Sequence, residues 1–331
     1  MQKYSYIFDT FGSSFGVSGN WPDCLKDICT WYKMPLLATS HEPELTIEIS
    51  GTDMEEMDAR LPLPADNYKL KKGVMLANEK FDYTPYADNE RQWIDYARVG
   101  RIMIDYANGS AIALMRGSAM LPTYQKILFP DYALDKLLTS RGIFSMHASC
   151  AAVCGKGIAF TGDSGAGKST AAFILMQKGM QILTDEKLYV FKTDDGYQAG
   201  AVSDIIKVND DSMSRFFANH DSYQEYDVIS GEHYLKISGT KSTPCEKETP
   251  LKALCLLEQT GEPQTQISAV NPTKLVGGLF PVTITGTIRR YKAAKFDFIM
   301  EMLNTIECRL VKFGTDPDDF AENIEKLAAT L

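Results

Sequence analysis

The chain has 331 residues, of which 44% are hydrophobic and 23% charged, a composition that suits one or two soluble globular domains. Its net charge of −9, with scattered basic residues, argues against nucleic acid and anionic membrane as partners. Neither a long apolar run nor a secretory pattern at the N-terminus is present, so we expect a cytoplasmic protein that does not span a membrane.

The cysteines favour reduced thiols over a disulfide framework, because their number is odd and the chain shows no export signal. The four histidines have no zinc-ligand spacing, so we expect no structural metal site. Most of the cysteines are expected to be small buried side chains. They are Cys24, Cys29, Cys150, Cys154, Cys245, Cys255 and Cys308.

Short elements of both kinds are expected in the first part of the chain. Residues 20–34 carry apolar residues at helical spacing. Residues 44–50, "ELTIEIS", alternate as a half-buried strand does. Residues 101–117 predict two strands joined by a tight turn at Asn108-Gly109. None of these residues indicates a chemistry, so the role of this part stays open.

A helix over residues 130–142, with proline at its start and glycine at its end, is expected to link two domains. We predict a β-rich α+β domain over residues 1–135, for which substrate recognition is one option, and a second domain over residues 136–331. The polar, turn-rich residues 238–250 predict a mobile loop. Further predicted elements are strands at 251–259 and 308–314 and helices at 296–306 and 316–331.

Residues 162–169, "GDSGAGKS", fit the P-loop pattern of two glycines separated by four residues and followed by lysine and serine. Backbone N–H groups of such a loop surround phosphate, the lysine reaches the terminal phosphates and the serine hydroxyl ligates magnesium. An apolar strand precedes the loop and an apolar helix follows it, as this motif requires. The predicted nucleotide-binding residues are Gly162, Asp163, Ser164, Gly165, Ala166, Gly167, Lys168, Ser169 and Thr170.

Two further features flank this loop. The next apolar strand, in "MQILTDEKLYV", ends in Asp185-Glu186. An acid there can hold magnesium, and a second can take a proton from an attacking hydroxyl. His147 precedes Lys168 by 21 residues. A lone histidine is more often structural, so its residue type alone leaves its role open.

The run "HASCAAVCGKGIAFTGDSGAGKST", followed by "KGMQILTDE", resembles the C-terminal catalytic domain of HPr kinase/phosphorylase. That bacterial enzyme phosphorylates a serine of a sugar-transport phosphocarrier. The run is more similar still to the HPr kinase-related proteins, over residues 147–189, with a weaker likeness as far as the C-terminus. The resemblance implies an α/β fold like that of phosphoenolpyruvate carboxykinase, a mixed sheet with a P-loop, after a smaller β-rich N-terminal domain.

The resemblance also implies roles for single residues. His147, Lys168, Asp185 and Glu186 would be catalytic, and Ser169 and Asp185 would hold Mg²⁺. In HPr kinase the acid pair is Asp-Asp and its second member accepts the proton, so Glu186 departs from the family pattern. The reference pKa values of the two residue types are close, so Glu186 can keep that role.

An arginine that the family uses has no counterpart at the matching place in this chain. Lys241 and Lys247 stand there instead, and the pair Arg289-Arg290 is another basic candidate. A lysine cannot make the bidentate contact of an arginine. A further magnesium-ligating acid is expected from the family, and three residues are equally eligible: Asp204, Asp210 and Asp211.

The sequence therefore predicts an ATP- and Mg²⁺-dependent kinase that transfers the γ-phosphate to a serine-type hydroxyl of a protein, peptide or small molecule. One alternative is a nucleotide-binding module that recognises a peptide or protein and transfers nothing. Another is a carboxykinase-like enzyme acting on small molecules. The ring assembly of HPr kinase makes a homo-oligomer an option here, although no contact surface carries over.

Overall fold

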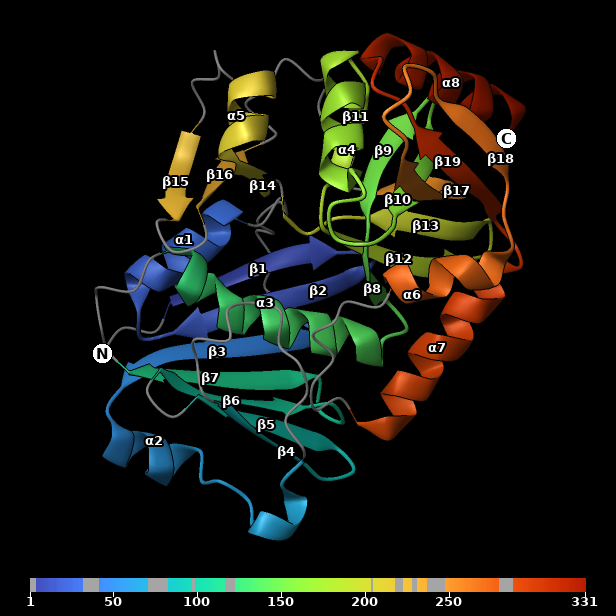
Figure 1. The fold of residues 1–331 in the computed structure, drawn as a ribbon. Coiled ribbons are helices and arrows are strands. Elements are labelled where there is room, and N and C mark those ends of the chain that lie inside the picture. The colour runs from blue at the N-terminus through green and yellow to red at the C-terminus, as the bar shows by residue number, and fades with distance from the viewer. Residues whose placement is uncertain are drawn as a thin grey trace. The chain divides into compact units, whose positions relative to one another are not determined.

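The computed structural model describes residues 4–31, 42–70, 83–96, 99–116, 123–203, 205–217, 223–227, 231–236, 248–279 and 288–331. Its elements are labelled in Figure 1. The chain divides into two compact units, which we call unit 1 (Met1–Phe144 with Val282–Phe296) and unit 2 (Ser145–Pro281 with Asp297–Leu331). The first unit thus extends beyond residue 135, where the sequence suggested a boundary, and takes in a segment from late in the chain.

Unit 1 contains, among the described residues, a seven-stranded mixed sheet in the order β1-β2-β3-β7-β6-β5-β4. The predicted strand at residues 44–50 is confirmed as β3, and the predicted hairpin at Asn108-Gly109 is confirmed as the turn between β6 and β7. The strands are β1 (Tyr4–Thr10), β2 (Ser13–Gly19), β3 (Leu45–Thr52), β4 (Tyr83–Ala87), β5 (Arg91–Tyr96), β6 (Gly100–Asp105) and β7 (Ser110–Arg116).

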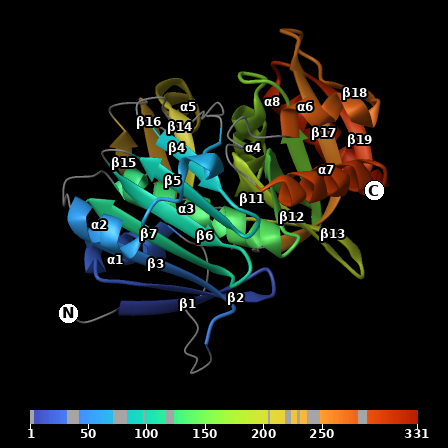
Figure 2. The same cartoon turned by 90° about the horizontal axis from the view of Figure 1, so that it is seen from below.

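Helices cover both faces of this sheet. The predicted helix at residues 20–34 is confirmed as α1 (Pro22–Trp31), which packs with α3 (Thr123–Ser140), and α3 contacts β3, β6 and β7 (Figure 2). Successive strand residues point to opposite faces. On β5, Gln92 bonds to Tyr132 of α3, whereas Trp93 packs with α2 (Met54–Arg60). The α2 helix therefore covers the face opposite α3. A 3₁₀ turn, η1 (Asp66–Tyr68), follows it.

The prediction that a helix begins at Pro130 is wrong, because α3 starts at Thr123 and Pro130 lies inside it. Proline in a helix interior removes a hydrogen bond and usually kinks or ends the helix. Here tertiary packing outweighs that cost, since the same helix buries a continuous apolar face. The buried residues of that face are Phe129, Ala133, Leu134, Leu137 and Leu138.

Three polar side chains of unit 1 are linked by hydrogen bonds: Gln92 and Tyr106 are buried, and Tyr132 of α3 is half-buried. The Gln92 amide nitrogen donates to the Tyr132 hydroxyl at 2.7 Å, and the Tyr106 hydroxyl donates to the Gln92 amide oxygen at 2.8 Å. Burial raises the pKa of both tyrosines well above the ordinary value, so the two hydroxyls stay neutral. We call Gln92, Tyr106 and Tyr132 the tyrosine–glutamine cluster.

Unit 2 is built, in the part that the structure describes, on a nine-stranded mixed sheet in which β10, β17 and β19 are parallel neighbours. The predicted strands at 251–259 and 308–314 are confirmed as β17 and β19. The strands are β8 (Phe144–His147), β9 (Ser149–Val153), β10 (Lys156–Thr161), β11 (Gln181–Thr184), β12 (Lys187–Thr193), β13 (Gly196–Gly200), β17 (Glu248–Gln259), β18 (Gln266–Ala269) and β19 (Glu307–Phe313).

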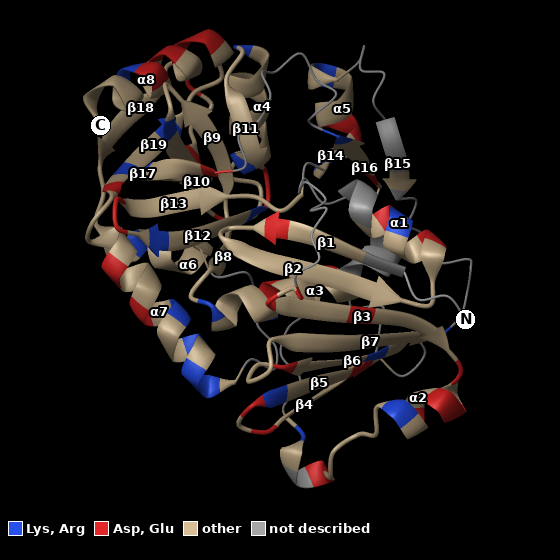
Figure 3. Cartoon of the chain, turned by 180° about the vertical axis from the view of Figure 1, so that it is seen from behind, with Lys and Arg blue, Asp and Glu red and all other residues tan. Residues whose placement is uncertain are grey.

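The helices of unit 2 enclose this sheet because β10 sends alternate side chains to opposite sides. Ile158 and Phe160 join a core with α4 (Lys168–Gln177) and α8 (Pro317–Thr330), whereas Ala159 joins a core with α6 (Val276–Leu279) and the C-terminal half of α7 (Arg289–Leu303). The predicted helix at 316–331 is confirmed as α8, and the helix predicted at 296–306 is the second half of α7. The acidic first turn of α8 is visible in Figure 3.

A second, three-stranded sheet of unit 2 has the order β14-β16-β15 among the described residues: β14 (Ile205–Asn209), β15 (Tyr223–Asp227) and β16 (Glu232–Lys236). The short helix α5 (Asp210–Phe216) follows β14, and the 3₁₀ turn η3 (Pro272–Leu275) leads into α6. Most of the predicted loop at 238–250 lies outside the described residues. No helix in the described ranges is long and apolar enough to cross a membrane.

Candidate functional site

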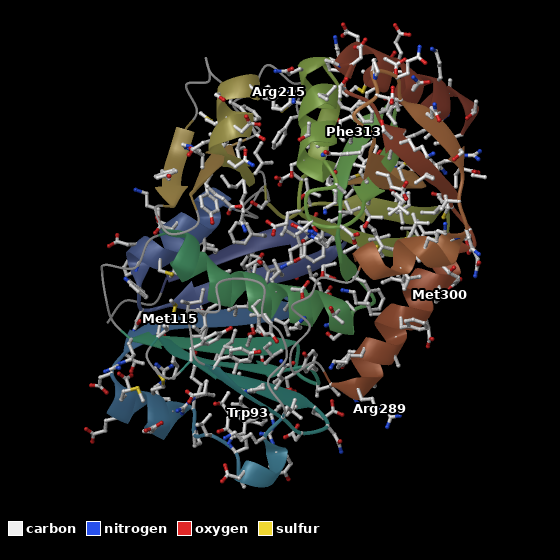
Figure 4. The ribbon with its side chains drawn as sticks, viewed as in Figure 1. Trp93, Met115, Arg215, Arg289, Met300 and Phe313 are labelled. Carbon is white, nitrogen blue, oxygen red and sulfur yellow. The ribbon has the colours of Figure 1, made fainter. Side chains whose placement is uncertain are left out.

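The glycine loop, residues 162–167, joins the end of β10 to the start of α4. Gly165 and Gly167 have positive φ angles of +82° and +96°. A Cβ atom on Gly167 would lie 3.0 Å from two ring carbons of Phe313, which Figure 4 labels, and 3.1 Å from the Gln259 amide nitrogen. That amide also donates to the Gly165 carbonyl at 3.1 Å. Glycine is therefore required at 167 for conformation and for space.

The same loop is approached from its β10 side by α6. A Cβ atom on Gly278 would lie 2.6 Å from the Thr161 hydroxyl oxygen and 3.0 Å from the Gly162 backbone nitrogen. Its neighbour Gly277 has no atom within 4 Å of the corresponding position. The absence of a side chain at Gly278 thus allows the backbone of α6 to touch the first residue of the loop.

Lys168 is buried at the start of α4, with its ammonium directed at its own loop. The Nζ atom donates to the carbonyls of Gly162 at 2.9 Å and Asp163 at 3.1 Å. The hydroxyl of the buried Ser149 donates to the Lys168 carbonyl at 3.0 Å and so fixes the first turn of the helix. Burial lowers the pKa of Lys168, while the negative charges of Asp163 and Glu186 oppose that shift.

Asp185 lies directly after β11 and its side chain is buried. Burial, and secondarily the negative charge of Glu186, raise the pKa of Asp185 to about 8. Three influences lower it: the Lys207 ammonium, and hydrogen bonds from the backbone of Asp185 itself and of Lys207. With a pKa of about 8, this carboxyl is largely protonated at neutral pH.

Glu186 differs from its neighbour, because 49% of its side chain is exposed and it forms an ion pair. Its Oε2 atom lies 3.1 Å from the Lys207 Nζ atom. Partial burial acts to raise the pKa of Glu186, but the Lys207 ammonium outweighs it and holds that pKa below the ordinary value. The adjacent acids are thus in opposite states at neutral pH: Asp185 mostly neutral, Glu186 ionised.

His147 ends β8 and is half-buried. The next residue, Ala148, donates its backbone N–H to the Glu186 carbonyl at 3.2 Å, which ties the histidine's strand to the acid pair. Burial and the Lys168 ammonium lower the pKa of His147, although Glu186 opposes them. The imidazole is therefore mostly neutral at neutral pH and can accept or donate a proton.

The structure brings four predicted residues into one electrostatic neighbourhood, since His147, Lys168 and Asp185 each have a pKa that responds to Glu186. The remaining predicted residues lie along the loop and the first turn of α4. Asp163, Ser164 and Gly165 are exposed, and Ala166, Gly167, Ser169 and Thr170 are half-buried.

Lys207, on β14, belongs to the same neighbourhood and was missed by the sequence analysis. Its residue type and its place in "IIKVND" carry no motif, so only the pairing of β14 within the fold could have identified it. The basic residues named from the sequence were Lys241, Lys247, Arg289 and Arg290. Lys241 and Lys247 fall outside the described residues. Arg290 forms a bidentate ion pair with Glu90, at 2.8 and 2.5 Å, within unit 1.

Three acids were candidates for the family's later magnesium ligand, and the structure describes two of them, Asp210 and Asp211. Asp204 lies outside the described residues, and Asp210 pairs with the His233 ring at 2.6 Å. Asp211 is exposed in the first turn of α5. Arg289 is exposed at the start of α7, where Figure 4 labels it.

The donor set around the loop suits Mg²⁺. Magnesium is usually held by one or two carboxylates together with substrate phosphates and water, rather than by a cage of protein ligands. The described residues contain no group of three or more His, Cys, Asp or Glu that could hold a metal alone. Ser169 offers a hydroxyl, and Asp185 offers a buried carboxyl that a divalent cation would ionise.

Comparison with known proteins finds relatives that share part of this chain. No family model matches. An HPr kinase/phosphorylase from Lacticaseibacillus casei is 35% identical over 104 residues, 31% of this chain and 31% of that protein. The protein of the same name from Latilactobacillus sakei is 33% identical over 105 residues, 32% of each chain. That from Streptococcus equinus is 25% identical over 164 residues, 42% of this chain and 52% of the relative.

Among solved structures, the Hpr(Ser) kinase/phosphatase from Coxiella burnetii matches 56% of this chain and 94% of its own, with 11% identity and a TM-score of 0.29. A score of that size carries no argument about the fold. The first two sequence relatives are matched over about a third of their own length. The comparisons therefore bear out the resemblance that the motif suggested: a segment of about 31% of this mixed α/β chain is similar to proteins named HPr kinase/phosphorylase.

Proposed function

We propose that this protein is an ATP- and Mg²⁺-dependent kinase that transfers the γ-phosphate to a serine-type hydroxyl. The observation that carries the proposal is the placement of a glycine loop and its buried lysine in the same electrostatic neighbourhood as a buried acid and an ionised acid. The relatedness to proteins named HPr kinase/phosphorylase supports it. The proposal includes a nucleotide fold like that of phosphoenolpyruvate carboxykinase for residues 136–331, and a cytoplasmic site of action.

The loop and Lys168 would bind the phosphates. Backbone N–H groups that follow the positive-φ glycines form an anion-binding concavity, and the N-terminus of α4 adds to it. The Lys168 ammonium supplies positive charge where negative charge collects during transfer. Ser169 and Asp185 would hold Mg²⁺, which supplies neutralisation of the phosphate oxygens.

Glu186 and His147 would handle the proton of the acceptor. Glu186 is ionised and partly exposed, so it can accept a hydroxyl proton, although its lowered pKa limits its strength as a base. His147, mostly neutral and influenced by both Glu186 and Lys168, can relay that proton. Most of the rate would come from positioning and charge neutralisation, as in phosphoryl transfer generally.

The acceptor that we propose first is a protein, because the relatives carry the name of HPr. The matched segment is a minor part of those relatives, and residues 1–135 would provide recognition of the acceptor. A hydroxyl of a peptide or small molecule is the alternative acceptor. Assembly into a homo-oligomer is compatible with both kinds of acceptor.

Two measurements on the whole chain test the proposal. The first is binding of a fluorescent ATP analogue with and without Mg²⁺. The second is transfer of radiolabelled γ-phosphate to purified HPr and to water. In the Lys168→Ala variant we expect transfer to fall about 10³-fold. In Lys192→Ala, which alters an exposed ion pair with Glu301, transfer should be unchanged. Equal transfer by wild type and Lys168→Ala contradicts the proposal.

A second function, a nucleotide-binding module without transfer, is favoured by one observation. The Glu186 carboxylate is engaged by Lys207 and has a lowered pKa, which makes it a weaker base. Tight Mg²⁺-dependent binding of the ATP analogue, together with no transfer to HPr or to water, would support this second function.

A further inference from the structure

Lys207 occupies its place because of strand alternation on β14. Its neighbours Ile206 and Val208 are each 1% exposed and belong to the core that contains α4. Side chains of adjacent strand residues point to opposite faces, so the Lys207 side chain leaves that core on the other face. Its cross-strand partner on β16 is Tyr234, whose ring centre lies 6.0 Å from the Nζ atom. The aromatic ring thereby restricts the lysine on one side.

The same residue is attached to both members of the acid pair by different groups. Its ammonium lies 3.1 Å from Glu186, and its backbone hydrogen-bonds to the Asp185 carboxyl. The two side chains of the ion pair are 39% and 49% exposed, and exposed pairs of this kind contribute little to folding stability. What the arrangement does provide is a fixed direction for a Glu186 side chain that would otherwise rotate freely.

We propose that Lys207 is a positioning residue that holds the Glu186 carboxylate at the place where it receives the proton of the acceptor. The inference rests on the proposed function, because it assigns Glu186 the role of base. Other ionisable groups that interact electrostatically with Glu186 are His147, Lys187, Lys168 and Asp185. Lys187 has its Nζ atom 5.6 Å from the centre of the Tyr189 ring. Lys207 forms a direct ion pair with Glu186.

A pair of substitutions tests this role through coupling. Lys207→Ala should lower the rate of γ-phosphate transfer to HPr and to water by about 10- to 100-fold, because a small misplacement of a reacting group costs that much. The dissociation constant for the Mg²⁺–ATP analogue and the unfolding midpoint should both stay close to wild type. Lys207→Arg, which keeps the charge and can keep the pair, should retain more of the rate than Lys207→Ala.

The decisive comparison uses Glu186→Gln. If Lys207 acts through Glu186, the double variant Lys207→Ala/Glu186→Gln should transfer phosphate no more slowly than Glu186→Gln alone. Multiplied losses in the double variant overturn the inference, since they mean that Lys207 acts independently. So does a loss of ATP-analogue affinity that matches the loss of rate, because that indicates direct contact with phosphate.

Lys192→Ala serves as the matched control, since Lys192 is an exposed lysine of the same unit paired with Glu301. If Lys207→Ala behaves like this control while wild type transfers phosphate, the positioning role is wrong and the kinase proposal stands. If wild type transfers nothing to HPr or to water, the kinase proposal fails first and the positioning role fails with it.

Discussion

Both units bury polar side chains, but the two sets differ in how their groups are satisfied. In unit 1 the tyrosine–glutamine cluster consists of neutral groups that bond to one another at 2.7 and 2.8 Å. In unit 2 the buried groups near the glycine loop include two ionisable ones, and burial drives Asp185 and Lys168 towards their neutral forms. The groups of the first set hydrogen-bond to one another. The charged forms of the second set become favourable when a group of opposite charge lies beside them.

The comparison teaches that burial of polar groups is a poor indicator of function by itself. A self-satisfied cluster fixes the packing of a core. A set of ionisable groups displaced from their ordinary pKa values marks a site for a charged ligand. Substitutions in unit 1 should therefore change stability, and substitutions in unit 2 should change ligand binding and its dependence on pH.

The largest expected effect is that of Asp185→Asn on the pH dependence of the unfolding free energy. The folded-state pKa of Asp185, about 8, lies above its ordinary value of 3.8. The folded protein therefore holds a proton that the unfolded chain releases, so stability is full below about pH 4 and falls as the pH rises towards 8. Between pH 5 and pH 8, wild type should lose on the order of 2–4 kcal/mol of unfolding free energy through this group, and Asp185→Asn should not show that loss. Urea unfolding at the two pH values measures the difference.

The same variant should lose Mg²⁺-dependent binding of the ATP analogue, so that a gain in stability accompanies a loss of function. Asp194→Asn, in the exposed turn between β12 and β13, is the matched control and should alter neither property. An unchanged pH dependence in Asp185→Asn would show that this carboxyl is not the group that titrates.

Gln92→Leu should show the opposite pattern in unit 1. It removes the amide that hydrogen-bonds to the hydroxyls of both Tyr106 and Tyr132, at a cost of about 2–3 kcal/mol of unfolding free energy. Binding of the ATP analogue at 25 °C should be retained. Adding Tyr106→Phe should recover part of the loss, because one unsatisfied hydroxyl disappears. A stability equal to wild type would contradict the account of the cluster.

Gly278→Ala tests the approach of α6 to the glycine loop. The new methyl group would overlap Thr161 and the backbone of Gly162, so we expect about 2 kcal/mol of destabilisation and weaker binding of the ATP analogue. Gly277→Ala provides the matched control, since no atom lies within 4 Å of its Cβ position. Thermal unfolding and analogue titration of the two variants should separate them, and identical behaviour would rule out a steric cause.

The smallest effect expected is the difference between Gly167→Ala and Gly165→Ala. Both residues have left-handed backbones, so each substitution carries a similar conformational cost of about 1–2 kcal/mol. Only at Gly167 does a Cβ meet other atoms, those of Phe313 and Gln259. The unfolding free energy of Gly167→Ala should therefore be about 1 kcal/mol lower than that of Gly165→Ala. The reverse order would show that the ring moves away freely.

The parts that sequence could predict are those whose geometry is local. The glycine loop is a continuous run between a strand and a helix, and Asp185-Glu186 directly follows a strand, so their residue order already places them. The strands and helices around them were predicted for the same reason, because periodicity along a short segment reports which face is buried.

The parts that sequence missed depend on contacts between distant segments. Lys207 reaches Glu186 only because β14 pairs with β16 and packs on the core of α4. Pro130 remains inside α3 because tertiary packing outweighs the local preference to start a helix at proline. The opposite ionisation of Asp185 and Glu186 likewise follows from burial and from Lys207, neither of which is visible in two adjacent acidic letters.

The hydrogen bonds of the Lys168 ammonium bear on which anions the loop would bind in the function that we propose. An ammonium group has three protons, and the carbonyls of Gly162 and Asp163 account for two of them. The Lys168 ammonium therefore helps to maintain the curvature of its own loop. On the function that we propose, a chain of phosphates would contact this ammonium and also span the amides of the loop, whereas a single inorganic phosphate would reach fewer of these donors. We therefore expect the loop to bind the longer anion more tightly.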